Sequence, residues 1–224
     1  MDKEYREFRM SDYRMYSMQL GMVQTNCYLV WNDDTREAFV VDPADRADVI
    51  AMKLRQNGLV LKAILLTHGH FDHMMAVPDL KKMFDVPVYA GEAERPILMD
   101  ASANLSEAWG GLAVEFEADH YVKDGEMIQI AGFDITVIST PGHTIGGVCY
   151  YLKDEGQLFA GDTLFRRSYG RTDLETGNTL SLMQSIQKKV LVLPPETYVY
   201  PGHDAATSIE FERRYNPMAR GMRF

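Results

Sequence analysis

Three histidines and an aspartate lie in one short segment, Thr67 to His73, which reads Thr-His-Gly-His-Phe-Asp-His. Imidazole nitrogens and carboxylate oxygens are typical ligands of divalent transition metals. The segment directly follows the apolar run Leu61 to Leu66, which is typical of a buried strand. These residue types and their spacing predict a metal site at the end of that strand, suited to activating water or polarising a carbonyl group.

Backbone geometry can bring the four side chains of this segment to one cleft. Side chains alternate along an extended chain, so we expect His68, His70 and Asp72 on one side. A turn into the helix predicted next along the chain brings His73 round to them. Structural zinc sites are usually closed and rich in cysteine. This segment has no cysteine, which favours a site that is open to a substrate.

Three further candidate ligands follow strand-like runs later in the chain: His143, Asp162 and His203. Seven ligands are too many for one tetrahedral ion, but they suit two ions that share a carboxylate, and we expect Asp162 to be that bridge. The remaining ligands divide into His68, His70 and His143 for the first ion and Asp72, His73 and His203 for the second. Of the six histidines, only His120 is left over, either as a surface histidine or with a role of its own.

Alternating strand and helix signals must position these residues. Apolar runs between turn residues predict strands at Cys27 to Trp31, Glu37 to Val41, Leu61 to Leu66, Val86 to Ala90, Glu126 to Ile130, Phe133 to Ser139, Val148 to Leu152, Gln157 to Ala160 and Thr197 to Tyr200. Helices are predicted at Arg46 to Gln56, His73 to Phe84 (with Pro78 in its first turns), Glu92 to Met99, Leu180 to Leu191 and Thr207 to Tyr215.

The tripeptide Pro-Gly-His follows a predicted strand twice in the chain. It ends in His143 after the strand Ile135 to Thr140, and in His203 after the strand Thr197 to Tyr200. Two β-rich halves would each deliver a histidine from a strand end to a shared cleft. This repetition predicts an α/β sandwich whose site lies on loops, held by a rigid scaffold.

The composition predicts one soluble globular domain over residues 1–224. Hydrophobic residues make up 46% of the chain and charged residues 25%, which is ordinary for a protein that buries its own core. A net charge of −9 disfavours binding to a phosphate backbone, so no nucleic-acid partner is expected. The chain has no apolar run long enough to span a membrane and no secretory signal, so we expect a cytoplasmic protein. Cys27 and Cys149 are expected to be reduced, buried thiols.

Taken together, the histidine motif and the three later ligands resemble those of the metallo-β-lactamase superfamily. The segments Phe159 to Phe165 and Tyr200 to His203, with Gly170-Arg171, Glu212 and Asn216-Pro217, are most similar to glyoxalase II-like hydrolases, that is, to single-domain hydroxyacylglutathione hydrolases. The resemblance spans about Asn26 to Pro217 and implies an α/β (α+β) fold, a four-layer αββα sandwich. The ligand assignment given above agrees with that of the family.

The sequence departs from this pattern at two points, and a third position matches it but has two explanations. Two-domain glyoxalase II enzymes carry a C-terminal helical domain that helps to hold glutathione, and too few residues follow His203 to form it. After His143 the family often has Thr-x-Gly-His or Thr-x-Gly-Ser, whereas this chain has Gly147 in place of the polar residue. Arg171 matches a basic position near the substrate's thiol carrier in the family, and it is either a substrate-binding residue or a surface partner of Asp173 or Glu175.

The resemblance implies a mechanism based on hydroxide. Two divalent ions, expected to be zinc although iron or manganese suits the same ligands, would hold a hydroxide that attacks a small acyl thioester such as S-lactoylglutathione. We expect Asp72 to be catalytic, because it can accept the hydrogen bond of the hydroxide and take up a proton. Asp42 is a candidate for orienting a ligating histidine, although an aspartate before Pro43 is also a common turn signal. Thr67 and Thr140 are expected to bond to nearby backbone.

Three other functions remain open from the sequence. A mononuclear iron dioxygenase acting on persulfides needs two histidines and a carboxylate, which His68 or His70, His143 and Asp162 could supply. The complete second set of ligands favours hydrolysis over this reaction. A non-catalytic metal-binding module would be indicated by lost ligands, and none is lost. The acidic charge and the short chain disfavour a nuclease.

Overall fold

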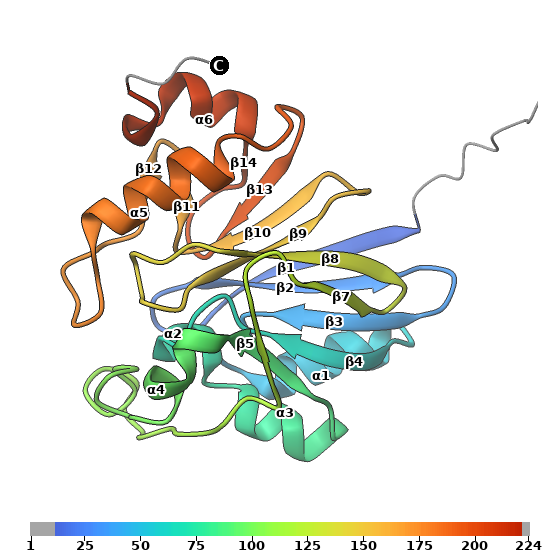
Figure 1. The fold of residues 1–224 in the computed structure, drawn as a ribbon. Helices are drawn as coiled ribbons and strands as arrows, with labels where there is room; N and C mark the ends of the chain where they lie inside the picture. Colours follow the sequence, from blue (N-terminus) through green and yellow to red (C-terminus); the bar gives the residue numbers. More distant parts are fainter. Residues whose placement is uncertain (1–11, 221–224) are drawn as a thin grey trace, which may run out of the picture.

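The computed structural model describes residues 12–220, which form two six-stranded β-sheets packed face to face, with helices on both outer sides (Figure 1). Helices α1 (Ala47–Gln56) and α3 (Val77–Phe84) cover the first sheet, and α5 (Thr179–Ser185) and α6 (Ile209–Tyr215) cover the second. The predicted four-layer αββα sandwich is therefore confirmed. Across residues 12–220, no helix is both long and apolar enough to cross a membrane.

The first sheet has the strand order β1-β2-β3-β4-β5-β6, with bounds Tyr13–Leu20, Thr25–Asn32, Glu37–Val41, Val60–Leu65, Val88–Gly91 and His120–Val122. The second sheet has the order β14-β13-β10-β9-β8-β7, with bounds Thr207–Ser208, Tyr198–Pro201, Gln157–Gly161, Val148–Leu152, Phe133–Ser139 and Met127–Ile130. A small ribbon pairs β11 (Leu164–Phe165) with β12 (Ser168–Tyr169).

Strand β3 shows why the two sheets pack together. Its side chains alternate between two cores: Ala38 and Val40 pack among the residues on the helical side, while Phe39 and Val41 face the second sheet. A strand that is buried on both faces reads as a continuous apolar run, as this one does. Phe39 meets Phe159 of β10 edge to face across the sheet interface, with ring centroids 6.5 Å apart.

Parallel strand pairs in both sheets end at the site. Strands β3 and β4 run parallel, so their carboxyl ends bring Asp42 and Thr67 side by side. Strands β10 and β13 also run parallel, so Asp162 and His203 leave neighbouring strand ends. The site thus lies where strand ends of the two sheets meet, as the repeated Pro-Gly-His turns predict.

The single helix predicted from His73 to Phe84 is wrong. The chain forms the short helix α2 (Phe71–Met74) and then begins α3 at Val77. Pro78 has no amide hydrogen, and within one continuous helix its ring would clash with the carbonyl group four residues earlier, at Met74. The backbone amide of Ala76 instead bonds to the carbonyl of Pro43, which ties the break to the loop after β3.

Other predicted boundaries also need correction. The helix predicted over Glu92 to Met99 is a 3₁₀ turn, η1 (Glu92–Glu94), followed by α4 (Arg95–Leu98). The helix predicted to end at Leu191 becomes a π-helix, η2 (Ile186–Val190), after Ser185, and a last 3₁₀ turn, η3 (Pro217–Ala219), follows α6. The helix predicted from Thr207 begins at Ile209, because Thr207 and Ser208 pair with β13.

Candidate metal centre

All seven predicted side chains lie together at one edge of the sandwich. The first sheet supplies four of them: His68 and His70 on the loop after β4, and Asp72 and His73 on α2. The second sheet supplies the other three, from the ends of β8, β10 and β13: His143, Asp162 and His203. Asp72 was expected to follow His70 on an extended chain. That expectation is wrong, because the chain becomes helical at Phe71.

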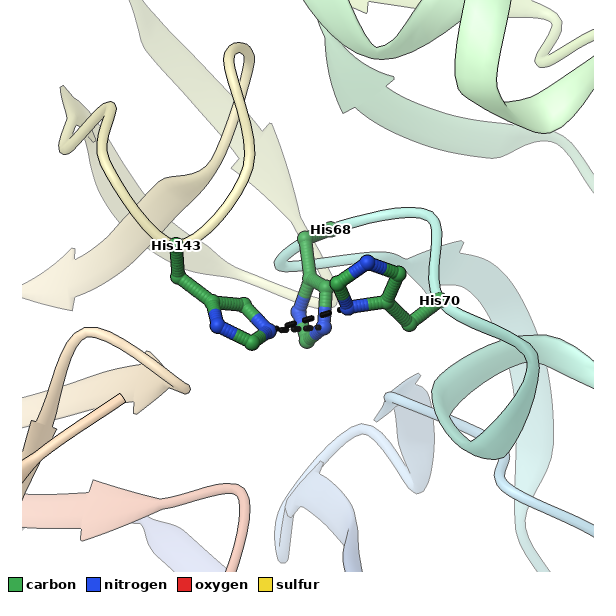
Figure 2. A group of neighbouring side chains, drawn as sticks. All are labelled: His68, His70 and His143. Atoms are coloured by element: carbon green, nitrogen blue, oxygen red, sulfur yellow. Dashed lines mark hydrogen bonds between the residues drawn. The ribbon is translucent and has the colours of Figure 1, made fainter. Parts of the chain in front are cut away.

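Three histidines point their ring nitrogens at one another (Figure 2). Nε2 of His143 lies 2.9 Å from Nδ1 of His70 and 3.2 Å from Nε2 of His68. All three side chains are almost completely buried. Buried imidazole nitrogens that converge at such short distances are arranged as ligands of a single cation.

A second trio consists of Asp72, His73 and His203. Oδ2 of Asp72 lies 3.2 Å from Nε2 of His203 and 3.5 Å from Nε2 of His73. The hydroxyl group of Thr25 donates a hydrogen bond of 2.7 Å to the same carboxylate oxygen. Thr25 belongs to β2 and was not predicted, since a threonine at a strand end carries no distinctive sequence signal.

Asp162 lies between the two trios. Its Oδ1 is 3.4 Å from Nε2 of His73, and its Oδ2 is 3.5 Å from Nε2 of His143 and 3.6 Å from Nε2 of His203. One carboxylate therefore reaches donor atoms of both trios, which is the geometry that a shared ligand needs.

Two buried polar atoms at the centre of the cluster indicate whether metal ions fit there. Nε2 of His73 and Oδ1 of Asp162 are buried and have no hydrogen-bond partner within residues 12–220. Buried polar atoms are rarely left unpaired in folded proteins. The donor set contains only nitrogen and oxygen, which suits zinc, iron or manganese. The cluster is therefore suited to a site of two metal ions.

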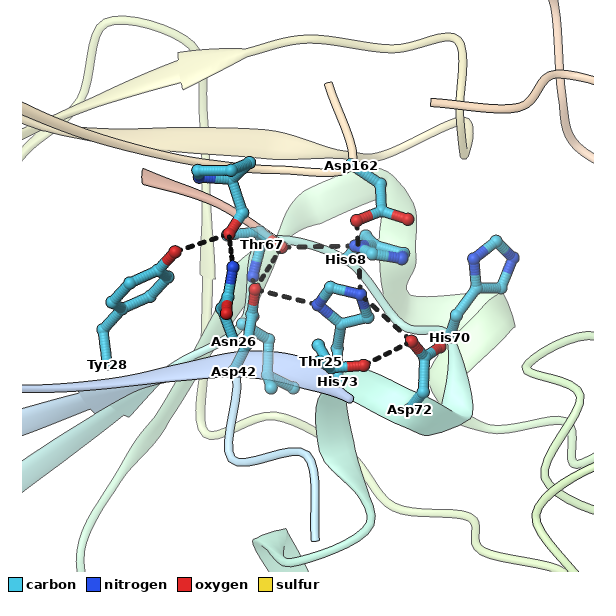
Figure 3. A network of polar contacts seen from close by, with 12 residues as sticks. Thr25, Asn26, Tyr28, Asp42, Thr67, His68, His70, Asp72, His73 and Asp162 are labelled. Carbon is cyan, nitrogen blue, oxygen red and sulfur yellow. Dashed lines mark hydrogen bonds and ion pairs between the residues drawn. The ribbon is translucent and has the colours of Figure 1, made fainter. Parts of the chain in front are cut away.

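Asp42 orients His73 (Figure 3). Oδ2 of Asp42 lies 2.9 Å from Nδ1 of His73, and the carboxylate also accepts hydrogen bonds from the amide and the hydroxyl group of Thr67. An ionised carboxylate can only accept, so Nδ1 of His73 carries a proton and Nε2 faces the cluster. Asp42 also has a positive φ of 49°, so it turns the chain as well as orienting the histidine.

Backbone and hydroxyl groups hold two other rings. The carbonyl oxygen of Arg171 lies 2.8 Å from Nδ1 of His143, so Nδ1 donates to it and the ring presents Nε2 to the cluster. The hydroxyl group of Thr67 lies 3.2 Å from Nδ1 of His68. The hydroxyl group of Thr140 lies 2.8 Å from that of Thr163.

Burial and charge keep these groups in the forms that bind metal. Burial lowers the pKa of His70 to about 3, and burial together with neighbouring histidines lowers the pKa of His68 well below its usual value. Burial by itself would raise the pKa of Asp72, but the charge of His73 and hydrogen bonds from His203 and Thr25 outweigh it, so this pKa lies below its usual range. Neutral imidazoles beside an ionised carboxylate are the state that attracts a cation.

Burial lowers the pKa of His73, but the three surrounding carboxylates outweigh it and raise the pKa well above the usual value. The carboxylates belong to Asp72, Asp42 and Asp162. The negative potential that holds a proton on this ring would equally favour a divalent cation in its place.

A pocket opens beside the cluster. Five apolar side chains line it together with the ligands: Val23, Phe71, Leu105, Trp109 and Leu174. Arg171 lines it too, but its guanidinium group makes a two-pronged contact of 2.8 and 2.7 Å with Asp173 and lies over the ring of Trp109. Arg171 thus borders the pocket and pairs with Asp173 at once. His120 lies outside the cluster, exposed on β6 and stacked on Tyr89.

The second Pro-Gly-His turn needs glycine at position 202 because its backbone lies directly against the cluster. A Cβ atom at this position would lie 2.2 Å from Oδ1 of Asp162 and 2.6 Å from Cε1 of His73. Any larger residue would push these two side chains apart, so the turn brings its backbone against the cluster only because Gly202 has no side chain.

Comparisons with known proteins agree with this geometry. "Probable metallo-hydrolase YqgX" of Bacillus subtilis is 38% identical over 91% of this chain and 96% of its own length. "Hydroxyacylglutathione hydrolase GloC" of Haemophilus influenzae is 33% identical over 87% of this chain and 92% of its own length.

Two solved structures have the same architecture. The crystal structure of the BLEG-1 B3 metallo-beta-lactamase matches with a TM-score of 0.88 and 40% identity, over 93% of this chain and 100% of that one. The structure of TTHA1623 in a di-iron-bound form matches with a TM-score of 0.80 and 36% identity, over 90% of this chain and 98% of that one. The sequence profile of the Metallo-beta-lactamase superfamily matches residues 20–203. The chain therefore belongs to the metallo-beta-lactamase superfamily.

Proposed function

We propose that this chain is a metal-dependent hydrolase that cleaves a small acyl thioester such as S-lactoylglutathione. The observation that carries the proposal is the complete second trio, Asp72, His73 and His203, joined to the first trio by Asp162. A persulfide dioxygenase would need only one iron on two histidines and a carboxylate. The second trio would then have no metal to bind. The name of the Haemophilus influenzae relative, hydroxyacylglutathione hydrolase, supports the thioester as substrate.

The chain would hold two divalent ions. His68, His70 and His143 would bind the first ion, Asp72, His73 and His203 would bind the second, and Asp162 would contact both. Bound divalent metal lowers the pKa of water to about 7, so that hydroxide is available at neutral pH. Zinc suits the nitrogen and oxygen donors, and iron does as well, as the di-iron form of TTHA1623 illustrates for that protein.

Asp72 would move the proton. Its carboxylate is fixed by the hydroxyl group of Thr25 and faces His203, and it remains ionised at neutral pH because its pKa is lowered. An ionised carboxylate at this position can accept the hydrogen bond of the attacking nucleophile and hold its proton during the attack. The thiolate leaving group needs little protonation, so one proton acceptor suffices.

The pocket would position the thioester. Its apolar side chains, among them Phe71, Leu105 and Trp109, offer a surface for the acyl group next to the ligand atoms. Arg171 would meet a carboxylate of the thiol carrier, in competition with Asp173. Neither cysteine can act as a nucleophile, because Cys27 and Cys149 are buried with raised pKa values.

Metal analysis combined with a substrate panel tests the proposal. We expect two ions per chain, turnover of S-lactoylglutathione, loss of turnover after chelation and recovery when metal is returned. The panel includes glutathione persulfide with an oxygen electrode, and a β-lactam because of the likeness to BLEG-1. Full activity at one ion per chain would eliminate the two-ion site, and oxygen uptake without thioester cleavage would replace hydrolysis by the dioxygenase reaction.

A further inference from the structure

Glu94 is a completely buried carboxylate outside the seven ligands. It ends the turn η1, and its exposed fraction is 0%. Burial raises its pKa to about 7, against the effect of three hydrogen bonds. A carboxylate is expensive to bury, so a fold that keeps one without a metal contact of its own has a structural or functional use for it.

The three hydrogen bonds of Glu94 come from two different loops. Oε2 accepts a bond of 3.0 Å from the amide of Gly69. Oε1 accepts a bond of 3.0 Å from the amide of Gly146 and another from the hydroxyl group of Thr144. Each oxygen of the carboxylate thus holds one loop.

These two loops carry the first trio. Gly69 lies between His68 and His70 on the loop after β4 of the first sheet, and Thr144 directly follows His143 on the loop after β8 of the second sheet. The ring nitrogens of His70 and His143 meet at 2.9 Å although their loops belong to different sheets. Glu94 therefore connects the two backbones whose separation decides whether these nitrogens can meet at one ion.

Close packing makes this connection stiff. A Cβ atom on Gly146 would lie 2.2 Å from the backbone nitrogen of Glu94, and one on Gly69 would lie 3.0 Å from Oε2 of Glu94. No water fits between groups in such direct contact. Thr144 is also completely buried, so its hydroxyl group is out of contact with bulk solvent.

We propose that Glu94 is a positioning residue, which fixes the loop of His68 and His70 against the loop of His143 and thereby sets the metal affinity of the first trio. The inference rests on the proposed function, since it takes the first trio to be a metal site. Glu94 belongs to neither trio of ligands and does not line the pocket, among the residues that the structure describes. Its effect passes through the amides of Gly69 and Gly146 and the hydroxyl group of Thr144.

The first experiment compares Glu94→Gln with Glu212→Gln. Glutamine has nearly the same volume, but its amide group would face the donor of one loop and so release that loop. Glu212 is a matched control because it is also 0% exposed and also accepts three hydrogen bonds, from Arg167, Thr207 and Asn216. Both variants should lose thermal stability, so stability alone does not distinguish them.

Zinc titration of the metal-free proteins against a chelator gives the deciding readout. Glu94→Gln should weaken the binding of one of the two ions by about 10- to 100-fold, while Glu212→Gln should change both affinities by less than about threefold. In the cobalt-substituted proteins, only Glu94→Gln should alter the visible absorption spectrum. Normal affinities and a normal spectrum in folded Glu94→Gln would overturn the proposal.

A second pair of variants decides the matter if Glu94→Gln does not fold. Thr144→Val keeps the shape but removes one donor to Glu94, whereas Thr144→Ser keeps the hydroxyl group. Zinc affinity should fall severalfold in the valine variant and be restored in the serine variant. Equal affinities in the two variants would reject the role of Glu94. Wild-type protein that binds no pair of ions would instead reject the proposed function, so the two failures are distinguishable.

Discussion

Asp42 and His73 are joined by a contact of 2.9 Å between Oδ2 and Nδ1, and this contact fixes which nitrogen of the ring faces the cluster. The same carboxylate is held from the other side by Thr67, one residue before His68. Asp42 therefore links the orientation of a ring in the second trio to the backbone that begins the first.

Asp42→Asn should reverse the tautomer of His73. The asparagine oxygen is expected to keep the bond from the amide of Thr67, so its amide group would donate to Nδ1 of His73 and move the ring proton to Nε2. We expect metal affinity of the second trio to fall by about 10- to 100-fold, measured by metal titration. The exposed Asp154→Asn is the control, and equal affinities in the two variants would contradict this reading of the contact.

Asp162→Ala should remove metal and activity together. Asp162 is the carboxylate that reaches both trios, so its loss leaves each trio with three ligands and removes the one negative charge that lies beside histidines of both. We expect less than one tightly bound ion per chain by elemental analysis, and thioester turnover at background. Retention of two ions would show that Asp162 is not shared.

Asp72→Ala should separate turnover from metal binding. The first trio does not include Asp72, so an ion should remain there, while loss of the proton acceptor should lower kcat by about 10²- to 10⁴-fold. Steady-state kinetics and metal analysis on the same preparation measure the two effects. A near-normal rate would show that another group takes up the proton.

Asp173→Asn should change the preference for the thiol carrier. Asp173 occupies the guanidinium group of Arg171 at the pocket, so its removal should free Arg171 for a carrier carboxylate. Because the pair is exposed, the effect should be small: KM for glutathione thioesters should fall by about two- to fivefold, with kcat unchanged. An uncharged N-acetylcysteamine thioester should show no change. Glu175→Gln is the control, and the same shift in that variant would indicate a general effect of charge.

His70 predicts how the stability of the metal-free protein depends on pH. Its pKa is about 3 in the fold and near 6.5 in an unfolded chain, so acid protonates the unfolded state first, and stability is lost as the pH falls through this window. Between about pH 6 and pH 4, the free energy of unfolding of wild type should fall more steeply than that of His70→Gln, by about 1.4 kcal/mol per pH unit. Denaturant unfolding at several pH values measures it, and parallel slopes would mean that His70 is accessible to protons in the fold.

Much of the site could be predicted because its residues are chemically distinctive. His68 to His73 form a dense motif, and His143, Asp162 and His203 each follow a clear strand. The local path was harder to predict: Asp72 was expected on an extended chain, but it lies on α2. Pro78 was expected in the first turns of a single helix from His73 to Phe84, but the chain leaves the helical path after Met74 and begins α3 at Val77.

The residues that the sequence did not reveal act through tertiary contacts. Thr25 and Glu94 have ordinary neighbours in the chain, and they become important only because the fold brings Asp72, Gly69 and Thr144 to them. Strand β6 (His120–Val122) was missed for a similar reason, since a short edge strand is stabilised by pairing with β5 more than by its own sequence.

Because the ligands are divided between the two sheets, the supply of metal ions should affect how much of the protein is folded. Four come from the first half of the chain and three from the second, so ions bound to them would link two halves that are far apart in sequence. A ligand that binds only the native state shifts the folding equilibrium by mass action. Cells starved of the ion should therefore contain less of the intact protein, because the metal-free protein unfolds more often and is degraded sooner.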